Sequence, residues 1–85
     1  MADVRVLRGT VEGGRIGSLV VAMHGLPERT LDREATLRWM KDGHSLVPVV
    51  AGRRLAALQL VEVDDQHFVR TDNAPVPEDV LPAFS

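Results

Sequence analysis

The stretch HFVRTDNAPVPEDVLPAFS, residues 67–85, decides how this chain is closed into a fold. Its first four residues carry the aromatic and β-branched side chains typical of a strand. A turn-forming Thr-Asp-Asn follows, and three prolines prevent regular structure beyond it. The end is nonetheless apolar, because Val80, Leu81 and Phe84 lie close together. We therefore expect residues 71–85 to fold back as an acidic, proline-containing tail that docks on the core.

Length and composition indicate one small soluble domain spanning residues 1–85. A chain of this size buries only about 60–65% of its unfolded surface, so its stability margin is thin. The chain contains no cysteine, which excludes disulfides, thiolate metal sites and thiol nucleophiles and favours a reducing cytoplasm. Nine of the ten cations are arginine, which suggests a GC-rich bacterial genome.

Charge and hydropathy give no sign of a membrane protein. The N-terminal residues lack a long apolar stretch, so we expect no signal peptide, and the apolar run 19–23 is far too short to cross a bilayer. Residues 1–70 carry ten cations against nine acids, and residues 71–85 carry three acids without a cation. The net charge of −2 therefore comes from the tail.

The first half of the chain predicts a hairpin. Val4, Val6 and Leu7 indicate a first strand that ends at Gly9 and turns at the following Gly-Gly pair. Residues 15–24 predict a second strand in which both alternating sets are mostly apolar. Such a strand is typically central, with both of its faces covered.

A helix is predicted over residues 31–42. Thr30 or Asp32 can cap its first turn, and Gly43 supplies the left-handed residue at which helices end. The helical spacing places Trp39 and Met40 on the apolar side, together with Leu31 and Ala35. We expect Trp39 to anchor this side on the sheet.

Three further strands are expected, over residues 46–51, 54–64 and 67–70. Pro48 in the first of them argues for an edge position or a bulge, because proline cannot donate to a ladder. The predicted order is β-β-α-β-β-β. The fold class is therefore α+β, with a mostly antiparallel, curved sheet and one helix packed on one face.

The pattern resembles a small bacterial family that is described only as a domain of unknown function. The resemblance rests on the helix end at 35–43, the strand Phe-Val-Arg-Thr at 68–71 and the terminus Leu-Pro-Ala-Phe at 81–84. It departs at residues 78–80, where Glu-Asp-Val replaces the Asn-Leu usual before Leu-Pro in that family. The resemblance implies this architecture, and it implies no catalytic residue.

Three histidines are the candidate metal ligands. His24, His44 and His67 all lie at the ends of predicted elements, where Asp64 or Asp65 could complete a zinc or iron site. No two of them have the spacing of a metal motif, and three separate surface histidines explain them equally well. We therefore predict no metal site.

No catalytic signature is present in the sequence. Ser18 and Ser45 lie outside any Gly-x-Ser-x-Gly context, and the glycines over residues 9–17 lack the Lys-Ser/Thr of a phosphate loop. Adjacent acids at 64–65 and 78–79 are typical of solvated turns. We predict no enzyme activity, no catalytic residue and no cofactor.

The remaining hypotheses concern binding. We expect a cytoplasmic binding or structural module that forms a homodimer or binds a protein partner, because strands apolar on both faces leave surface to cover. The candidate interaction surface comprises Arg53, Arg54, Arg70, Leu81 and Phe84. The alternative is nucleic-acid binding by an arginine strip on the hairpins. Its residues are Arg5, Arg8, Arg15, Arg53 and Arg54. The acidic pI of about 5.8 and the absence of interleaved aromatic residues disfavour that alternative.

Overall fold

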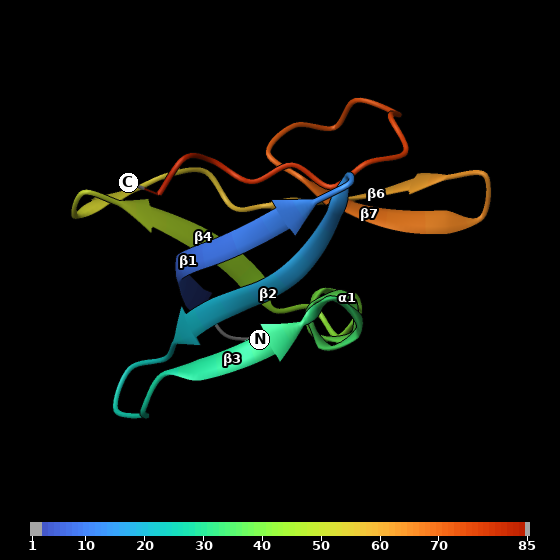
Figure 1. Cartoon of the computed structure of the whole chain (residues 1–85). Coiled ribbons are helices and arrows are strands. Elements are labelled where there is room, and N and C mark those ends of the chain that lie inside the picture. The colour runs from blue at the N-terminus through green and yellow to red at the C-terminus, as the bar shows by residue number, and fades with distance from the viewer. Residues whose placement is uncertain (1–2, 85) are drawn as a thin grey trace.

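The chain folds in the order β1–β2–β3–α1–β4–β5–β6–β7 in the computed structural model, which describes residues 3–84 (Figure 1). The elements are β1 Asp3–Glu12, β2 Arg15–Ala22, β3 Arg29–Asp32, α1 Arg33–Lys41, β4 Ser45–Val50, β5 Arg53–Arg54, β6 Gln59–Val63 and β7 Gln66–Arg70. One five-stranded sheet has the order β3-β2-β1-β4-β5, and β6 and β7 form a separate ribbon. All pairs are antiparallel except β1 and β4. The α+β class with one helix is therefore confirmed. Strand β3 was not expected from the sequence, and β5 overlaps the start of the strand predicted over residues 54–64.

The first strand does not end at Gly9, so that prediction was wrong. β1 continues to Glu12, and Gly9 serves close packing instead of a turn. A Cβ atom at Gly9 would lie 2.5 Å from a methyl carbon of Leu19 and 2.8 Å from one of Leu81. A side chain there would force the Leu19 and Leu81 side chains to shift, because real Cβ contacts are longer.

Strand β2 is central in the sheet, as predicted, between β1 and β3. Leu19 and Val21 point to the inner face of the sheet and are buried in the core. Val20 and Ala22 point to the outer face, where their partners on β1 are Arg8 and Arg5. The second apolar set of β2 therefore lies beside arginine side chains.

Helix α1 begins two residues later than the sequence suggested, because Leu31 belongs to β3. Asp32 is the N-cap, and its carboxylate accepts a 2.7 Å hydrogen bond from the amide of Ala35. At the other end Gly43 has φ +95°, and its N–H donates to the carbonyl of Met40. The predicted glycine stop is confirmed, since this bond belongs to the usual glycine-terminated helix end.

The strand predicted over residues 54–64 is divided into β5 and β6, and Pro48 in the neighbouring β4 explains the division. The carbonyl of Pro48 accepts from the amide of Leu55, so the side of Pro48 that lacks an N–H faces away from β1. A regular ladder cannot form on that side, because it would need the missing donor. The pairing with β4 therefore ends after the two residues of β5, and the next strand, β6, pairs with β7 instead. Pro48 lies in an inner strand of the sheet and not at the predicted edge position.

The β6–β7 ribbon ends in a two-residue turn. Asp64 and Asp65 have φ +52° and +66°, the left-handed values that match the twist of a tight hairpin. This turn places Val63 opposite Gln66 and Val69 opposite Leu60. Val69 is thereby directed into the core.

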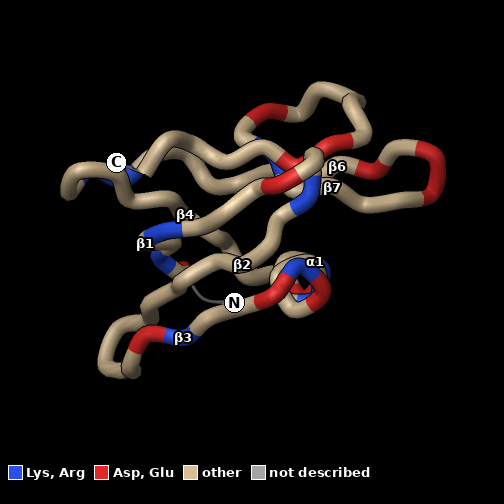
Figure 2. The backbone as a smooth tube through the Cα atoms, in the orientation of Figure 1, with Lys and Arg blue, Asp and Glu red and all other residues tan. Residues whose placement is uncertain are grey.

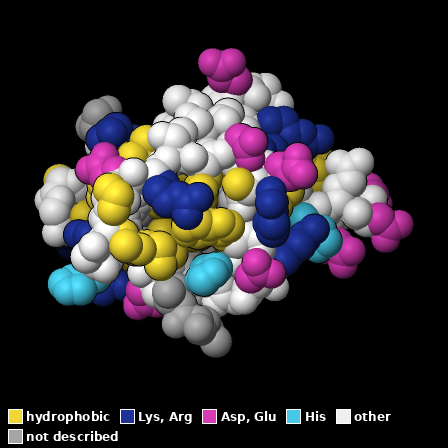
Figure 3. All heavy atoms as spheres, turned by 90° about the horizontal axis from the view of Figure 1, so that it is seen from below, with side chains coloured by type: hydrophobic (Ala, Val, Ile, Leu, Met, Phe, Trp, Pro, Cys, Tyr) yellow, Lys and Arg dark blue, Asp and Glu magenta, His cyan; other side chains and the backbone are white. Residues whose placement is uncertain are grey.

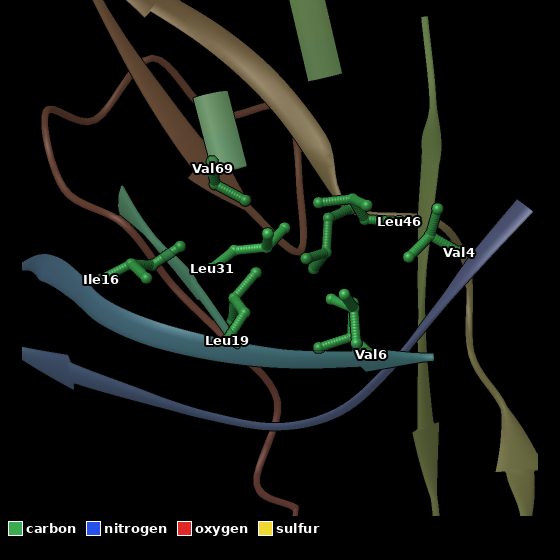
Figure 4. Packing of buried hydrophobic residues seen from close by; sticks show 9 residues of the cluster. Val4, Val6, Ile16, Leu19, Leu31, Leu46 and Val69 are labelled. Carbon is green, nitrogen blue, oxygen red and sulfur yellow. The ribbon is translucent and has the colours of Figure 1, made fainter. Parts of the chain in front are cut away.

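The core lies between the inner face of the sheet, the helix, the ribbon and the tail (Figure 4). Its buried members are Val4, Val6, Ile16, Leu19, Val21, Leu31, Leu46, Leu58 and Val69. Half-buried side chains of α1 and the tail pack against them, including Trp39, Met40, Leu81 and Phe84. Figure 1 shows the tail returning across the fold from the ribbon to the region of β4.

Candidate functional site

The most unusual polar group of the described chain is Asp79, whose side chain is fully buried. One carboxylate oxygen accepts from the amide of Ile16 at 2.8 Å and from Nε of Arg33 at 2.7 Å. The other accepts from the amide of Val69 at 3.0 Å and from Nη2 of Arg33 at 3.3 Å. We call these four residues the Asp79 cluster. It joins the tail to the start of β2, to β7 and to α1.

Arg33 reaches the cluster because it is the first residue of α1. Its Nη2 also donates to the carbonyl of His67 at 2.8 Å, so one guanidinium binds both the tail and β7. The same guanidinium lies 5.5 Å from the centre of the Phe68 ring, and that of Arg15 lies 4.7 Å from it. Phe68 is buried, and two guanidinium groups lie over its ring, whose electron-rich faces attract cations.

The pKa of Asp79 lies below its ordinary value despite burial. Burial raises the pKa of this carboxyl, but the hydrogen bonds from Arg33 and from the amides of Ile16 and Val69 lower it further. The group is therefore ionised at neutral pH, with donors on both oxygens. Such a carboxylate is suited to holding the tail, and it has little capacity left for proton transfer.

Arg70 forms a second link between β7 and the tail. Its Nε donates to Asp72 at 2.7 Å, and its Nη1 donates to the carbonyl of Glu78 at 2.9 Å. The hydrogen bond with Asp72 raises the pKa of Arg70 and lowers the pKa of Asp72, and in each residue it outweighs the opposing effect of burial. Arg70 was predicted to belong to an interaction surface, but it is buried, and its guanidinium binds Asp72 and the carbonyl of Glu78.

The other members of the predicted interaction surface lie in different places. Arg53 and Arg54 are exposed on β5. Leu81 and Phe84 are half-buried against the core. The structure therefore does not bring these residues together with Arg70 into one exposed surface.

The predicted arginine strip is interrupted by acids. Arg8 lies 3.5 Å from Glu28, and Arg54 lies 3.4 Å from Asp3. The guanidinium of Arg15 lies over the ring of Phe68. Figure 2 shows cations and acids alternating along the backbone, with acids at the tip of the ribbon. Two of the five arginines of the predicted strip are therefore paired with acids, and a third lies over an aromatic ring.

The three histidines do not form a metal site within residues 3–84. No group of three His, Asp or Glu side chains lies close enough there to hold an ion. The His44 ring instead contacts Trp39, with 5.4 Å between ring centroids. A shallow hollow beside α1 is lined by Glu34, Leu37, Arg38, Lys41 and Asp42, a set without a nucleophile and base pair.

Apolar side chains keep exposed surface in the turn before β3 and near the end of α1. We call this surface the β3-edge patch, and it comprises Met23, Leu26, Arg29, Trp39 and Met40. Leu26 is 57% exposed, and Met23, Trp39 and Met40 are half-buried. The guanidinium of Arg29 lies 5.3 Å from the centre of the Trp39 ring. Figure 3 shows hydrophobic side chains forming a band on this side of the molecule, with cations beside them.

Comparison with known proteins adds no family assignment: no family model, no curated protein and no solved structure matches this chain. The resemblance to a family of unknown function therefore stays a prediction. Among residues 3–84, no helix has the length and apolar character needed to cross a membrane.

Sequence reasoning missed the Asp79 cluster. Arg33 and Asp79 are 46 positions apart, and neither stands in a recognisable motif. The available signal was an acid placed directly before Val80 and Leu81 in a segment expected to dock. A carboxylate in such a segment must find donors when it is buried.

Proposed function

We propose that this protein is a non-enzymatic, cytoplasmic bacterial binding module that self-associates through the β3-edge patch. The observation that carries this proposal is an apolar surface containing a tryptophan and two methionines beside a terminal strand of the sheet. Aromatic residues, methionine and arginine are the types enriched where proteins bind one another.

The position of β3 supports a second copy of the chain as the partner. β3 is the last strand of the five-stranded sheet, and among residues 3–84 it pairs only with β2. The backbone groups on its free side can pair with another strand. A second copy offers the same edge and the same patch, so each contact would be made twice across a two-fold axis.

The arrangement of Arg29 also suits a protein partner. Its guanidinium stacks on Trp39, which leaves its donors at the margin of the patch. Tryptophan and arginine anchors of this kind supply much of the affinity in protein interfaces. Support for a non-enzymatic role comes from Asp79, whose two oxygens are occupied by donors from three elements of the fold and are buried away from substrate.

Nucleic-acid binding is the second candidate, because Arg5 and Arg8 share the outer face of the sheet with Arg54. The acids Asp3 and Glu28 pair with two of these arginines and reduce their attraction for phosphate. A salt titration against mixed nucleic acids separates the two candidates. Phosphate contacts produce a steep loss of affinity with salt, whereas an apolar protein contact does not.

Self-association is tested by sedimentation velocity over a concentration series. We expect the wild-type chain to dimerise and Leu26→Asp to weaken the dimer by about ten-fold or more, because a charge would be buried in the contact. Val76→Asp is the matched control, since Val76 is also an exposed aliphatic residue, 39% exposed, but lies in the tail. Wild-type protein that stays monomeric at high concentration, or equal effects of both substitutions, would contradict the proposal.

A further inference from the structure

The tail is held in the way that sheets bind extended peptides. The amide of Val80 donates to the carbonyl of Val69 at 2.9 Å, and the Asp79 carboxylate accepts from the amide of Val69. The amide of Asp79 in turn donates to the carbonyl of Gly14 at 2.8 Å. Backbone bonds to a strand edge combined with side-chain pockets are the features of strand-addition recognition.

Three side chains of this segment, those of Asp79, Leu81 and Phe84, have separate places in the fold. Asp79 enters the Asp79 cluster, and Leu81 lies against the gap left by Gly9. Phe84 packs against the core. Residues 78–84, which we call the docked segment, therefore form a short recognition sequence with three side chains placed against other parts of the fold.

The docked segment is joined to β7 by an exposed linker, residues 71–77. Its path contains two three-residue turns, in which Val76 donates to the carbonyl of Ala74 and Glu78 donates to that of Val76. Pro75 and Pro77 are the central residues, and their fixed φ suits such turns. Figure 1 shows this linker leading away from the ribbon before the chain returns to the sheet.

We infer that the groove that holds the docked segment also accepts the docked segment of a second copy, so that two chains exchange tails. The docked segment of a second copy has the same sequence and therefore fits the same groove. It supplies a carboxylate for Arg33, a leucine for the gap at Gly9 and a phenylalanine for the core. Exchange of an identical element is a low-cost route to a dimer, since the contacts stay the same.

The linker is long enough for this exchange. Seven residues opened from their turns span about 23 Å, which reaches a neighbouring chain. The chain's own tail competes at an effective concentration in the millimolar range. Exchange therefore increases with protein concentration and when a substitution weakens docking within one chain but not between two chains. This inference names a contact for the proposed self-association, but it uses a different surface from the β3-edge patch and does not need that patch.

The test uses two full-length variants, Arg33→Gln and Asp79→Asn, both in a Leu26→Asp background that disables the β3-edge patch. Neither variant can form the Arg33–Asp79 pair within one chain. When they are mixed, the groove of the Asp79→Asn chain can receive the tail of the Arg33→Gln chain, and one native pair is restored. Native mass spectrometry with one isotope-labelled chain counts the heterodimers.

We expect the ratio of heterodimers to homodimers to exceed its statistical value by about ten-fold or more, because charge-assisted hydrogen bonds shift an equilibrium by at least that factor. The matched control mixes Asp79→Asn with Arg38→Gln, an exposed arginine on the same helix. That mixture gains no native pair by exchange, so its heterodimers should follow statistics.

A statistical mixture in the test pair would overturn tail exchange, and wild-type dimers weakened by Leu26→Asp would then leave the proposed function standing. The converse result, excess heterodimer with a wild-type chain insensitive to Leu26→Asp, would support exchange and remove the β3-edge contact. If a variant is unfolded by itself, circular dichroism of the mixture gives the same answer. Recovery of the folded signal supports exchange, and no recovery contradicts it.

Discussion

The β7 edge and the β3 edge of this small fold differ in what covers them. At β7, the docked segment satisfies both outward backbone groups of Val69, with the Val80 amide on the carbonyl and the Asp79 carboxylate on the N–H. At β3, within residues 3–84, no strand pairs with the free side of the sheet. One edge is closed by the chain itself, and the other is left available to a partner.

The comparison shows that an irregular, proline-containing segment can close a strand edge. A regular strand would offer a carbonyl to Val69, and here a side-chain carboxylate takes that place. The carboxylate also accepts hydrogen bonds from Arg33 and Ile16, so a single residue joins β7, α1 and β2. Prolines reduce the freedom that the tail loses on docking, which lowers the entropic cost of this closure.

Removing the carboxylate should produce the largest effect at the closed edge. We expect Asp79→Ala to lower the free energy of unfolding by about 3–5 kcal/mol, because it leaves a largely buried guanidinium and two amides without their acceptor. Urea denaturation measures this change. Glu78→Ala, at an exposed neighbouring acid, is the control and should change stability little. Equal stabilities of the two variants would show that the edge is held by the apolar side chains alone.

A smaller effect is expected at the open edge. Trp39 is half-buried, so Trp39→Ala should cost about 2–3 kcal/mol, less than the cost of removing a fully buried tryptophan. Arg38→Ala, on the exposed side of α1, is the control. Thermal unfolding measures both variants, and the fluorescence of Trp39 should show partial contact with water. A fully exposed Trp39 would mean that the helix is not anchored by this residue.

The smallest effect concerns pH at the closed edge. Because the folded protein lowers the pKa of Asp79 below its ordinary 3.8, the folded state binds fewer protons than the unfolded state. The resulting stabilisation is present above pH 3.8 and is lost as pH falls through the folded pKa. Asp72, whose pKa is also lowered, acts in the same direction. We expect the melting temperature of Asp79→Asn to fall less steeply with acid than that of the wild type, and parallel curves would contradict this assignment.

Much of the local structure could be predicted from the sequence because it depends on neighbouring residues. The Gly43 stop was identified, and Asp32 was one of the two caps proposed, since capping uses atoms within one turn of the helix. The central position of β2 followed from its two apolar faces. The end of β1 was misplaced at Gly9, because the sequence does not distinguish a glycine that permits close packing from one that makes a turn.

The candidate sites were less predictable, and the reason is distance along the chain. The hypothesis that Arg70 belongs to an interaction surface rested on its place at a strand end, whereas its guanidinium bonds to Asp72 and Glu78. The β3-edge patch combines residues from β3, α1 and the turn before β3, and β3 had not been expected as a strand.

The sequence by itself determined the α+β class, the single helix and its caps, because periodicity and capping act between residues a few positions apart. The tertiary structure alone decided that Arg33 meets Asp79, that Gly9 makes room for Leu81, and that the ribbon stands apart from the sheet. These outcomes depend on contacts across 46 and 72 positions in the first two cases, where only the folded backbone brings the partners together. A buried carboxylate shows this most clearly, since its donors come from three elements that no local pattern relates.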